Sequence, residues 1–260
     1  MGALSTMNDY KEGRWLRGRI LERLNHASRQ FVPYLDSTKI GFLLNPFILS
    51  LSEQGDLLSQ WRAYASGGKG VALGLESSRL HIPAFRVEKE QMPGQTVLAN
   101  VIYNEEVQEN VVSRIVHIID CLVKELHGFE YEAHRHPFIP MAAYINMYLH
   151  YVEPLFKNPA FREEGEWRIV YFPQSHLSSF LEPTKTELSE KDEAAALRFR
   201  FREDDIVPHF LFPKESNIQE MISEIMLGPT CKMDQIFLTL FLNSCGVSSC
   251  SINRSKASLR

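Results

Sequence analysis

Two long stretches of helical periodicity, set among short segments of strand character, constrain the fold most. Apolar residues recur at helical spacing over roughly 107–126 and again over roughly 140–156, which is typical of helices with one buried face. Short strand-like segments surround them, at residues 46–52, 71–75, 85–87, 98–103, 164–171, 197–201, 205–211, 220–227 and 247–252. We expect an α+β fold with mixed, mostly antiparallel sheets and the two long helices packed on them.

Three shorter helices complete the prediction. The first contains Trp15 and Leu16, and Asn8 or Asp9 is expected to cap it. The second follows Asp56, which is expected to be its cap, and the glycines of GGKG (67–70) are expected to end it. The third spans roughly 233–244. We see no internal repeat and expect one domain over residues 1–260.

Composition narrows the class of protein. The chain has 260 residues, of which 44% are hydrophobic, and a net charge of −4. A chain of this size can bury a sizeable core without disulfides, and its charge argues against a nucleic-acid or membrane-surface coat. No apolar stretch is long enough to span a bilayer, and the first residues lack a signal-peptide pattern. Four cysteines without metal spacing indicate reduced thiols, so we expect a cytoplasmic protein.

Two sequence patterns invite a ligand-binding interpretation that their context does not favour. GGKG lies between a helix and a strand, whereas a phosphate loop needs a strand before it and a helix after it. His134 and His136 form an HxH pair, but no third residue lies at a telling metal spacing. We therefore predict no metal site.

An acidic pair gives the strongest indication of chemistry. Glu164 and Glu166 share one face of a predicted strand, and each carboxylate raises the pKa of the other unless a cation offsets them. Arg168 lies two residues further along the same face. The alternative interpretation is a surface strand with an ordinary ion pair.

Hydroxyl and aromatic side chains form a second group. Ser50 and Ser52 share a face of the strand at 46–52, where they either bond nearby backbone or line a cleft. Trp61 and Tyr64 lie three residues apart on the next helix and are expected in its core. The Tyr64 hydroxyl could also turn towards a cleft.

The order of these segments resembles the bacterial family called domain of unknown function twenty-nine seventy-one. The resemblance covers nearly the whole chain and depends on the following segments: Met7–Tyr10 with Glu12, SLSE (50–53), Asp56, WRAYA (61–65), GGKGVALGL (67–75), EEGEWRIVY (163–171), EIMLGP (224–229), Arg254-Ser255 and Leu259-Arg260. Members of that family usually carry an earlier strand of the type L-Y-x-Y. Since this chain begins almost at the N-D segment, the resemblance implies either an N-terminal truncation, through a misplaced gene start or a fragment, or loss of that strand.

More distantly, the family looks like toxin-type ADP-ribosyltransferases, which release nicotinamide from NAD through an oxocarbenium-like transition state. That resemblance implies an enzyme that uses NAD as substrate to modify a macromolecule in toxin or phage-defence systems. It assigns Glu166 as the catalytic glutamate, Glu164 as the residue that positions the acceptor, and Ser50 or Ser52 as the strand serine. Tyr64 or Trp61 would stack on nicotinamide, while Asp56 and Arg168 would line the cleft.

Two other classes of function stay open. In a non-enzymatic interaction or regulatory domain, the same carboxylates and arginines would form a structural network. In a metal-dependent nuclease or phosphodiesterase, Asp56, Glu164 and Glu166 would be hard oxygen ligands. This last class is less favoured, because the sequence has no D-x-D or H-x-D motif.

Overall fold

The computed structural model describes residues 1–3, 14–35, 46–85, 96–126, 137–172, 197–202, 205–211, 218–247 and 249–258. The predicted caps Asn8 and Asp9, the HxH pair and the final Leu259-Arg260 lie outside these residues. The chain divides into two compact units. Unit 1 comprises residues 1–50, 83–162 and 167–211, and unit 2 comprises residues 51–82, 163–166 and 212–260. The predicted α+β class is confirmed.

A six-stranded sheet belongs mostly to unit 1. Its strands lie in the order β4 (Thr96–Asn100), β5 (Glu166–Tyr171), β2 (Phe47–Ser52), β1 (Gly2–Ala3), β7 (Asp205–Phe210) and β6 (Leu197–Arg202). The pairs β4–β5, β1–β2, β1–β7 and β6–β7 are antiparallel, as predicted for most of the sheet. The hydroxyl-bearing strand β2 and the acidic strand β5 are therefore neighbours.

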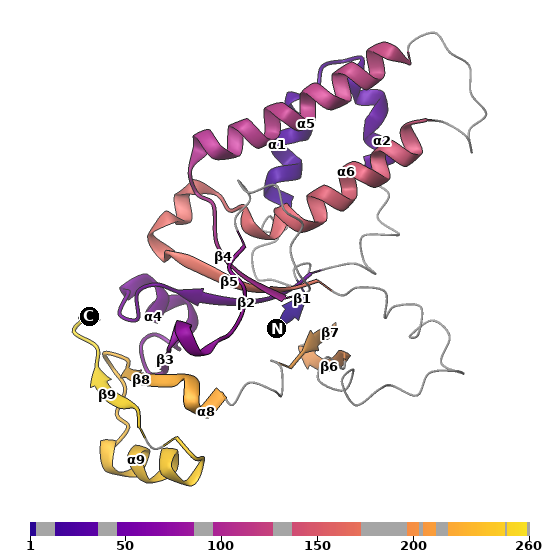
Figure 1. The fold of residues 1–260 in the computed structure, drawn as a ribbon. Coiled ribbons are helices and arrows are strands. Elements are labelled where there is room, and N and C mark those ends of the chain that lie inside the picture. Colours follow the sequence, from indigo (N-terminus) through magenta and orange to yellow (C-terminus); the bar gives the residue numbers. More distant parts are fainter. Residues whose placement is uncertain are drawn as a thin grey trace, which may run out of the picture. The chain divides into compact units, whose positions relative to one another are not determined.

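The helices of unit 1 gather into one layer, as Figure 1 shows. They are α1 (Trp15–Arg23), α2 (Val32–Leu35), α5 (Glu105–Glu125) and α6 (Phe138–Val152), with 3-10 turns η3 (Ser28–Phe31), η7 (Glu153–Leu155) and η8 (Pro159–Glu164). The last two residues of η8 are assigned to unit 2. The two long helices are those that the periodicity predicts.

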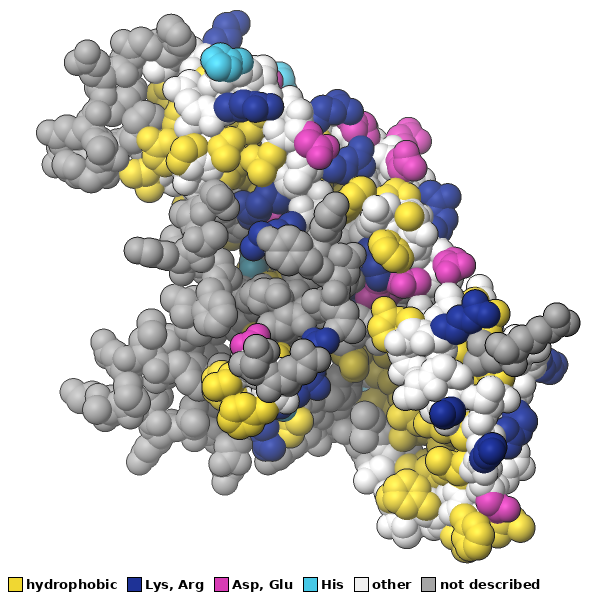
Figure 2. Space-filling view, turned by 180° about the vertical axis from the view of Figure 1, so that it is seen from behind, with side chains coloured by type: hydrophobic (Ala, Val, Ile, Leu, Met, Phe, Trp, Pro, Cys, Tyr) yellow, Lys and Arg dark blue, Asp and Glu magenta, His cyan; other side chains and the backbone are white. Residues whose placement is uncertain are grey.

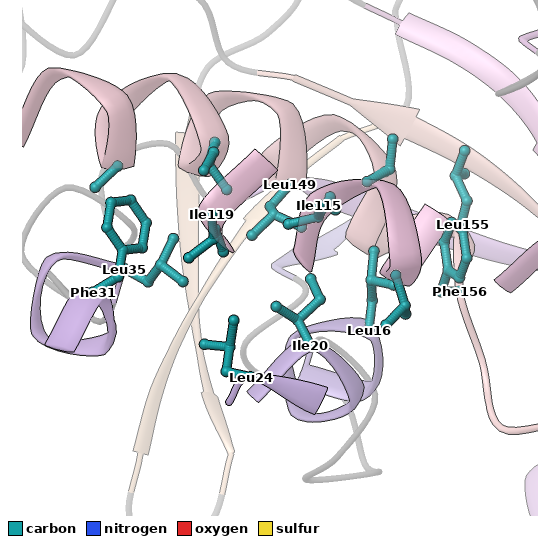
Figure 3. Packing of buried hydrophobic residues seen from close by; sticks show 14 of the residues in the cluster. Leu16, Ile20, Leu24, Phe31, Leu35, Ile115, Ile119, Leu149, Leu155 and Phe156 are labelled. Atoms are coloured by element: carbon teal, nitrogen blue, oxygen red, sulfur yellow. The ribbon is translucent and has the colours of Figure 1, made fainter. Parts of the chain in front are cut away.

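The core of unit 1 lies among these helices and between them and the sheet. Leu16 and Ile20 of α1 pack with Ile115 and Ile119 of α5 (Figure 3). Strand side chains such as Val170 join the same cluster. Burial of each large aliphatic side chain stabilises the fold by about 1.5–3 kcal/mol, so the helical stripes recognised in the sequence hold this unit together.

Helices α1 and α5 begin in different ways. Asn104 caps α5, and its side chain accepts hydrogen bonds from the amides of Glu106 (2.9 Å) and Val107 (3.2 Å). The predicted cap of the first helix is wrong. Helix α1 begins at Trp15, and Arg14 precedes it without a side-chain capping bond. Packing of one apolar face therefore stabilises α1 without a capping side chain.

Unit 2 holds a three-stranded sheet in the order β3 (Val71–Leu75), β8 (Ile222–Leu227) and β9 (Ser251–Arg254). Strands β3 and β8 are antiparallel, and β8 and β9 are parallel. Its helices are α4 (Leu58–Tyr64), α8 (Ile218–Met221) and α9 (Gln235–Ser244), with the 3-10 turn η4 (Ser77–Arg79). Helix α9 connects the two parallel strands and buries Leu238 and Leu242 against β8.

The glycine-rich turn ends α4, as predicted. Gly67 and Gly68 have φ angles of 65° and 84°, in the left-handed region that favours glycine. The Gly68 amide donates to the Trp61 carbonyl at 3.0 Å, which satisfies one of the last carbonyls of the helix. GGKG is therefore a helix stop followed by a strand.

Candidate functional site in unit 2

The predicted site residues divide between the two units. Ser50 and Arg168 belong to unit 1. The others belong to unit 2: Ser52, Asp56, Trp61, Tyr64, Glu164 and Glu166. The candidate site described below is therefore the part in unit 2.

Asp56 lies at the centre of a hydrogen-bond cluster. Its Oδ1 accepts from the Trp61 indole Nε1 at 2.7 Å and from the Ser255 hydroxyl, and its Oδ2 accepts from the Lys256 amide at 2.8 Å. Asp56 was predicted to cap α4, but the capping position is Leu57, and no side-chain capping bond forms there. The carboxylate instead joins α4 to the C-terminal segment.

The pKa of the Asp56 carboxyl lies below its usual value. Loss of solvation raises it, but hydrogen bonds from Ser255, from Trp61 and from the amides of Lys256 and Ala257 outweigh this effect. These bonds favour the ionised form. Asp56 is thus a carboxylate whose oxygens already accept several hydrogen bonds.

The serine strand and the acidic segment meet through backbone hydrogen bonds. The Ser52 hydroxyl donates to the Glu164 carbonyl at 2.8 Å, and the Glu53 amide donates to the Gly165 carbonyl at 3.0 Å. The same hydroxyl accepts from the Gln54 amide at 3.2 Å. Ser52 therefore has the backbone-bonding role that was the alternative to a cleft.

Glu164 and Glu166 do not lie on one strand face, which corrects the sequence prediction. Glu164 is the last residue of the 3-10 turn η8, and β5 begins only at Glu166. Gly165 between them has a φ of +49°, outside the strand region. Strand alternation therefore does not apply across this glycine.

Burial of the polar residues of β5 is the second correction. Glu166 is only 5% exposed, and Arg168 is completely buried. The Arg168 guanidinium, in unit 1, donates to the Pro154 carbonyl. The predicted polar face of this strand is not a solvated surface, because other parts of the chain cover it, among them the Pro154 carbonyl that binds Arg168.

The two aromatic residues of α4 have different environments. Trp61 is 3% exposed, with its indole N–H bound to Asp56, as expected of a core residue. Tyr64 is 63% exposed, so the prediction that it lies in the core is wrong. Tyr64 is therefore the more accessible of the two candidates for stacking on a flat ligand.

A metal-binding cluster and a cavity are two features by which a site can be recognised among the described residues. The described ranges hold no group of three His, Cys, Asp or Glu side chains that could hold a metal ion, so the nuclease alternative finds no ligand set there. A cavity of about 590 Å³ lies in unit 1, among α1 residues such as Trp15 and Gly18 and the first residue of α5. None of the predicted site residues lines it.

Comparison with known proteins gives a family match for part of the chain. Residues 60–169 match a family model. Its description is "Protein of unknown function (DUF2971)". This DUF2971 match supports the resemblance seen in the sequence, and it spans WRAYA, GGKGVALGL and the segment from Glu163 to Ile169. No curated protein and no solved structure matches the chain. The likeness to ADP-ribosyltransferases stays a prediction.

The structure also brings together motifs whose association the sequence does not predict. EIMLGP meets the glycine turn, since the Gly228 amide donates to the Gly70 carbonyl at 3.0 Å. The Arg254 guanidinium donates to the Cys231 carbonyl at 2.6 Å. Ser255 belongs to one of the family motifs, but its hydrogen bond with Asp56 was not predicted. Several of the motifs in unit 2 thus contact one another, namely EIMLGP with the glycine turn and Ser255 with Asp56.

Among the described helices, none has the length and apolar character needed to cross a bilayer.

Proposed function

We propose that unit 2 is a non-enzymatic interaction module whose shared motifs form its internal framework. The observation that carries this proposal is the hydrogen bonding of Asp56. Donors from α4 and from the C-terminal segment occupy both of its oxygens. A carboxylate that stabilises a reacting group needs a lone pair directed at that group, and here the carboxylate is used to hold two chain segments together.

The other motif contacts support the same conclusion. The Ser52 hydroxyl joins β2 to the segment before β5, and the glycine turn receives the end of β8. Each contact links segments that are far apart in the sequence. Such residues act by positioning backbone, and binding is left to the exposed surface of the unit.

Enzymatic ADP-ribosyl transfer is the second candidate function, and one specific observation favours it. Strands β2 and β5 are neighbours, and Ser52 lies within one hydrogen bond of the Glu164 backbone. In that reaction the bond between ribose C1′ of NAD and nicotinamide breaks, a nucleophile of the target bonds to C1′, and the nucleophile loses a proton. Glu166 would stabilise the positive charge on the ribose, and Tyr64 would stack on nicotinamide.

One assay separates the two candidates. The protein is incubated with NAD and cell extract, and nicotinamide release is compared among the wild type, Glu166→Gln and Glu163→Gln. Glu163 is a matched control, because it is an exposed glutamate three residues away. If unit 2 is an interaction module, we expect the same background release of nicotinamide in all three samples.

Release by the wild type and by Glu163→Gln, with a loss of about 100-fold or more in Glu166→Gln, would overturn the interaction module. That result would establish the transferase. Thermal unfolding of each variant checks that all three samples are folded.

A further inference from the structure

Helix α9 presents an apolar surface beyond the side that it buries. Leu238 and Leu242 face the core of unit 2. Four other side chains are largely exposed: Ile236 (71%), Phe237 (73%), Leu240 (59%) and Phe241 (62%). No residue of α9 from Gln235 to Ser244 is charged. Figure 2 shows hydrophobic side chains gathered over this part of the surface.

Strand β3 adds two exposed apolar side chains on the same face of the sheet. Val71 pairs with Leu227, and Leu73 pairs with Ile225. Directly opposed residues of an antiparallel pair project to the same side. Since Ile225 and Leu227 pack with the buried residues of α9, Val71 and Leu73 project to the side that α9 covers. They are 39% and 55% exposed.

Strand β3 also lies at an edge of its sheet. Strand β3 is the first strand of its sheet, and β8 is the one strand that pairs with it among the residues described. Its sequence VALGL contains neither proline nor a charged residue. Those are the features with which sheet proteins usually prevent edge-to-edge pairing.

We infer that these residues form the contact surface of a homodimer, in which β3 pairs antiparallel with β3 of a second copy. We name it the α9–β3 surface: Val71, Leu73, Ile236, Phe237, Leu240 and Phe241. When β3 pairs antiparallel with β3 of a second copy about a two-fold axis, the backbone N–H and C=O groups along the edge of each copy find hydrogen-bond partners.

Charge and area both favour a second copy as the occupant. Because the α9–β3 surface has no charged side chain, it meets itself without like-charge repulsion. Its exposed apolar area is on the order of 600–900 Å² per copy, since each of the six side chains contributes roughly 100–150 Å². If all of it is buried, two copies together reach about 1,200–1,800 Å², within the range for specific interfaces. The inference rests on the proposed interaction module and names one of its partners.

Sedimentation velocity of the full chain tests this inference. The wild type should sediment as a dimer, with twice the 29.9 kDa of one chain, at micromolar concentration. Phe237→Glu and Leu73→Lys should each shift the protein to the monomer, because each places a charge in the contact. Thr239→Glu should leave the dimer intact. Thr239 is exposed on the same helix, outside the α9–β3 surface. Circular dichroism confirms that each variant is folded.

A wild type that stays monomeric at 50 μM would overturn the inference, as would variants that dimerise like Thr239→Glu. Binding of a monomeric wild type to phosphatidylcholine–phosphatidylglycerol vesicles, lost in Phe237→Glu, would assign the surface to lipid and overturn it too. Nicotinamide release is a separate measurement, so failure of the dimer and failure of the interaction module are distinguishable.

Discussion

At the scale of single residues, burial decides the chemistry of several polar side chains. His150 of α6 packs beside the rings of Tyr151 and Phe172, with ring centroids 5.2 Å and 5.4 Å away. Burial lowers the pKa of His150 to about 4, because the charged imidazolium loses its solvation. The folded protein therefore keeps this histidine neutral well into the acid range.

This lowered pKa predicts a pH dependence of stability. Between pH 6.5 and about 4, His150 binds a proton in the unfolded chain and not in the folded chain, so the free energy of unfolding falls as the pH drops. The loss amounts to at most about 3 kcal/mol. His150→Gln should remove that part of the pH dependence in urea unfolding, whereas His26→Gln, at an exposed position, should not. Equal slopes in His150→Gln and in the wild type would contradict the assignment.

The same scale shows where sequence patterns are insufficient. The alternation after Glu164 correctly predicts a strand, and Trp61 is correctly predicted to lie in the core. The pattern cannot predict that Glu166 and Arg168 are buried, because burial depends on which distant segments cover the faces of the sheet. The glycine between the two glutamates is the available signal that alternation breaks there.

At the scale of elements, the end of strand β8 and the glycine turn after α4 pack so closely that only glycine fits at their contact. The end of β8 lies against the glycine turn, and a Cβ added to Gly228 would come within 2.2 Å of the Gly68 carbonyl oxygen. A backbone atom cannot move aside as a flexible side chain can. The contact therefore requires glycine at this position.

Gly228→Ala should destabilise the protein by roughly 2 kcal/mol or more, since the two segments must separate to admit a methyl group. Gly55→Ala is the control, because a Cβ there meets no atom within 4 Å. The free energy of unfolding in urea measures both. A Gly228→Ala variant as stable as Gly55→Ala would contradict the observed packing of β8 on the turn.

Element predictions succeed where local signals act alone. The glycines of GGKG end α4, as predicted, because glycine adopts the left-handed conformation readily. The Asn104 cap of α5 was not predicted, since that helix was expected from about residue 107. The strand predicted over 220–227 instead divides into α8 and β8. The last strand begins at Ser251 rather than at residue 247, since pairing with β8 determines its start.

At the scale of the whole molecule, contacts between distant parts of the sequence define unit 2. Residues 51–82, 163–166 and 212–260 form it together. Helical and strand periods report on neighbours along the chain, so they could not predict this assembly. The order of the family motifs indicates the family resemblance, but it does not predict that these motifs assemble into one unit. The chain forms two compact units. That they make up the single domain predicted over residues 1–260 is still a prediction.

Asp56 makes the longest of these connections, to Ser255 and Lys256 nearly 200 residues away. If the motifs are a framework, this carboxylate holds the C-terminal segment in place. Asp56→Asn puts an amide donor on one of the two atoms that now accept hydrogen bonds, and it removes the negative charge.

Amide hydrogen exchange of Lys256 and Ala257, measured by NMR in Asp56→Asn and in the wild type, tests the framework most directly. We predict that exchange of both amides becomes roughly 10-fold or more faster in the variant at neutral pH, as loss of about 1.5 kcal/mol of hydrogen bonding would cause. Unchanged exchange of both amides in a folded Asp56→Asn protein would contradict the structural role of Asp56.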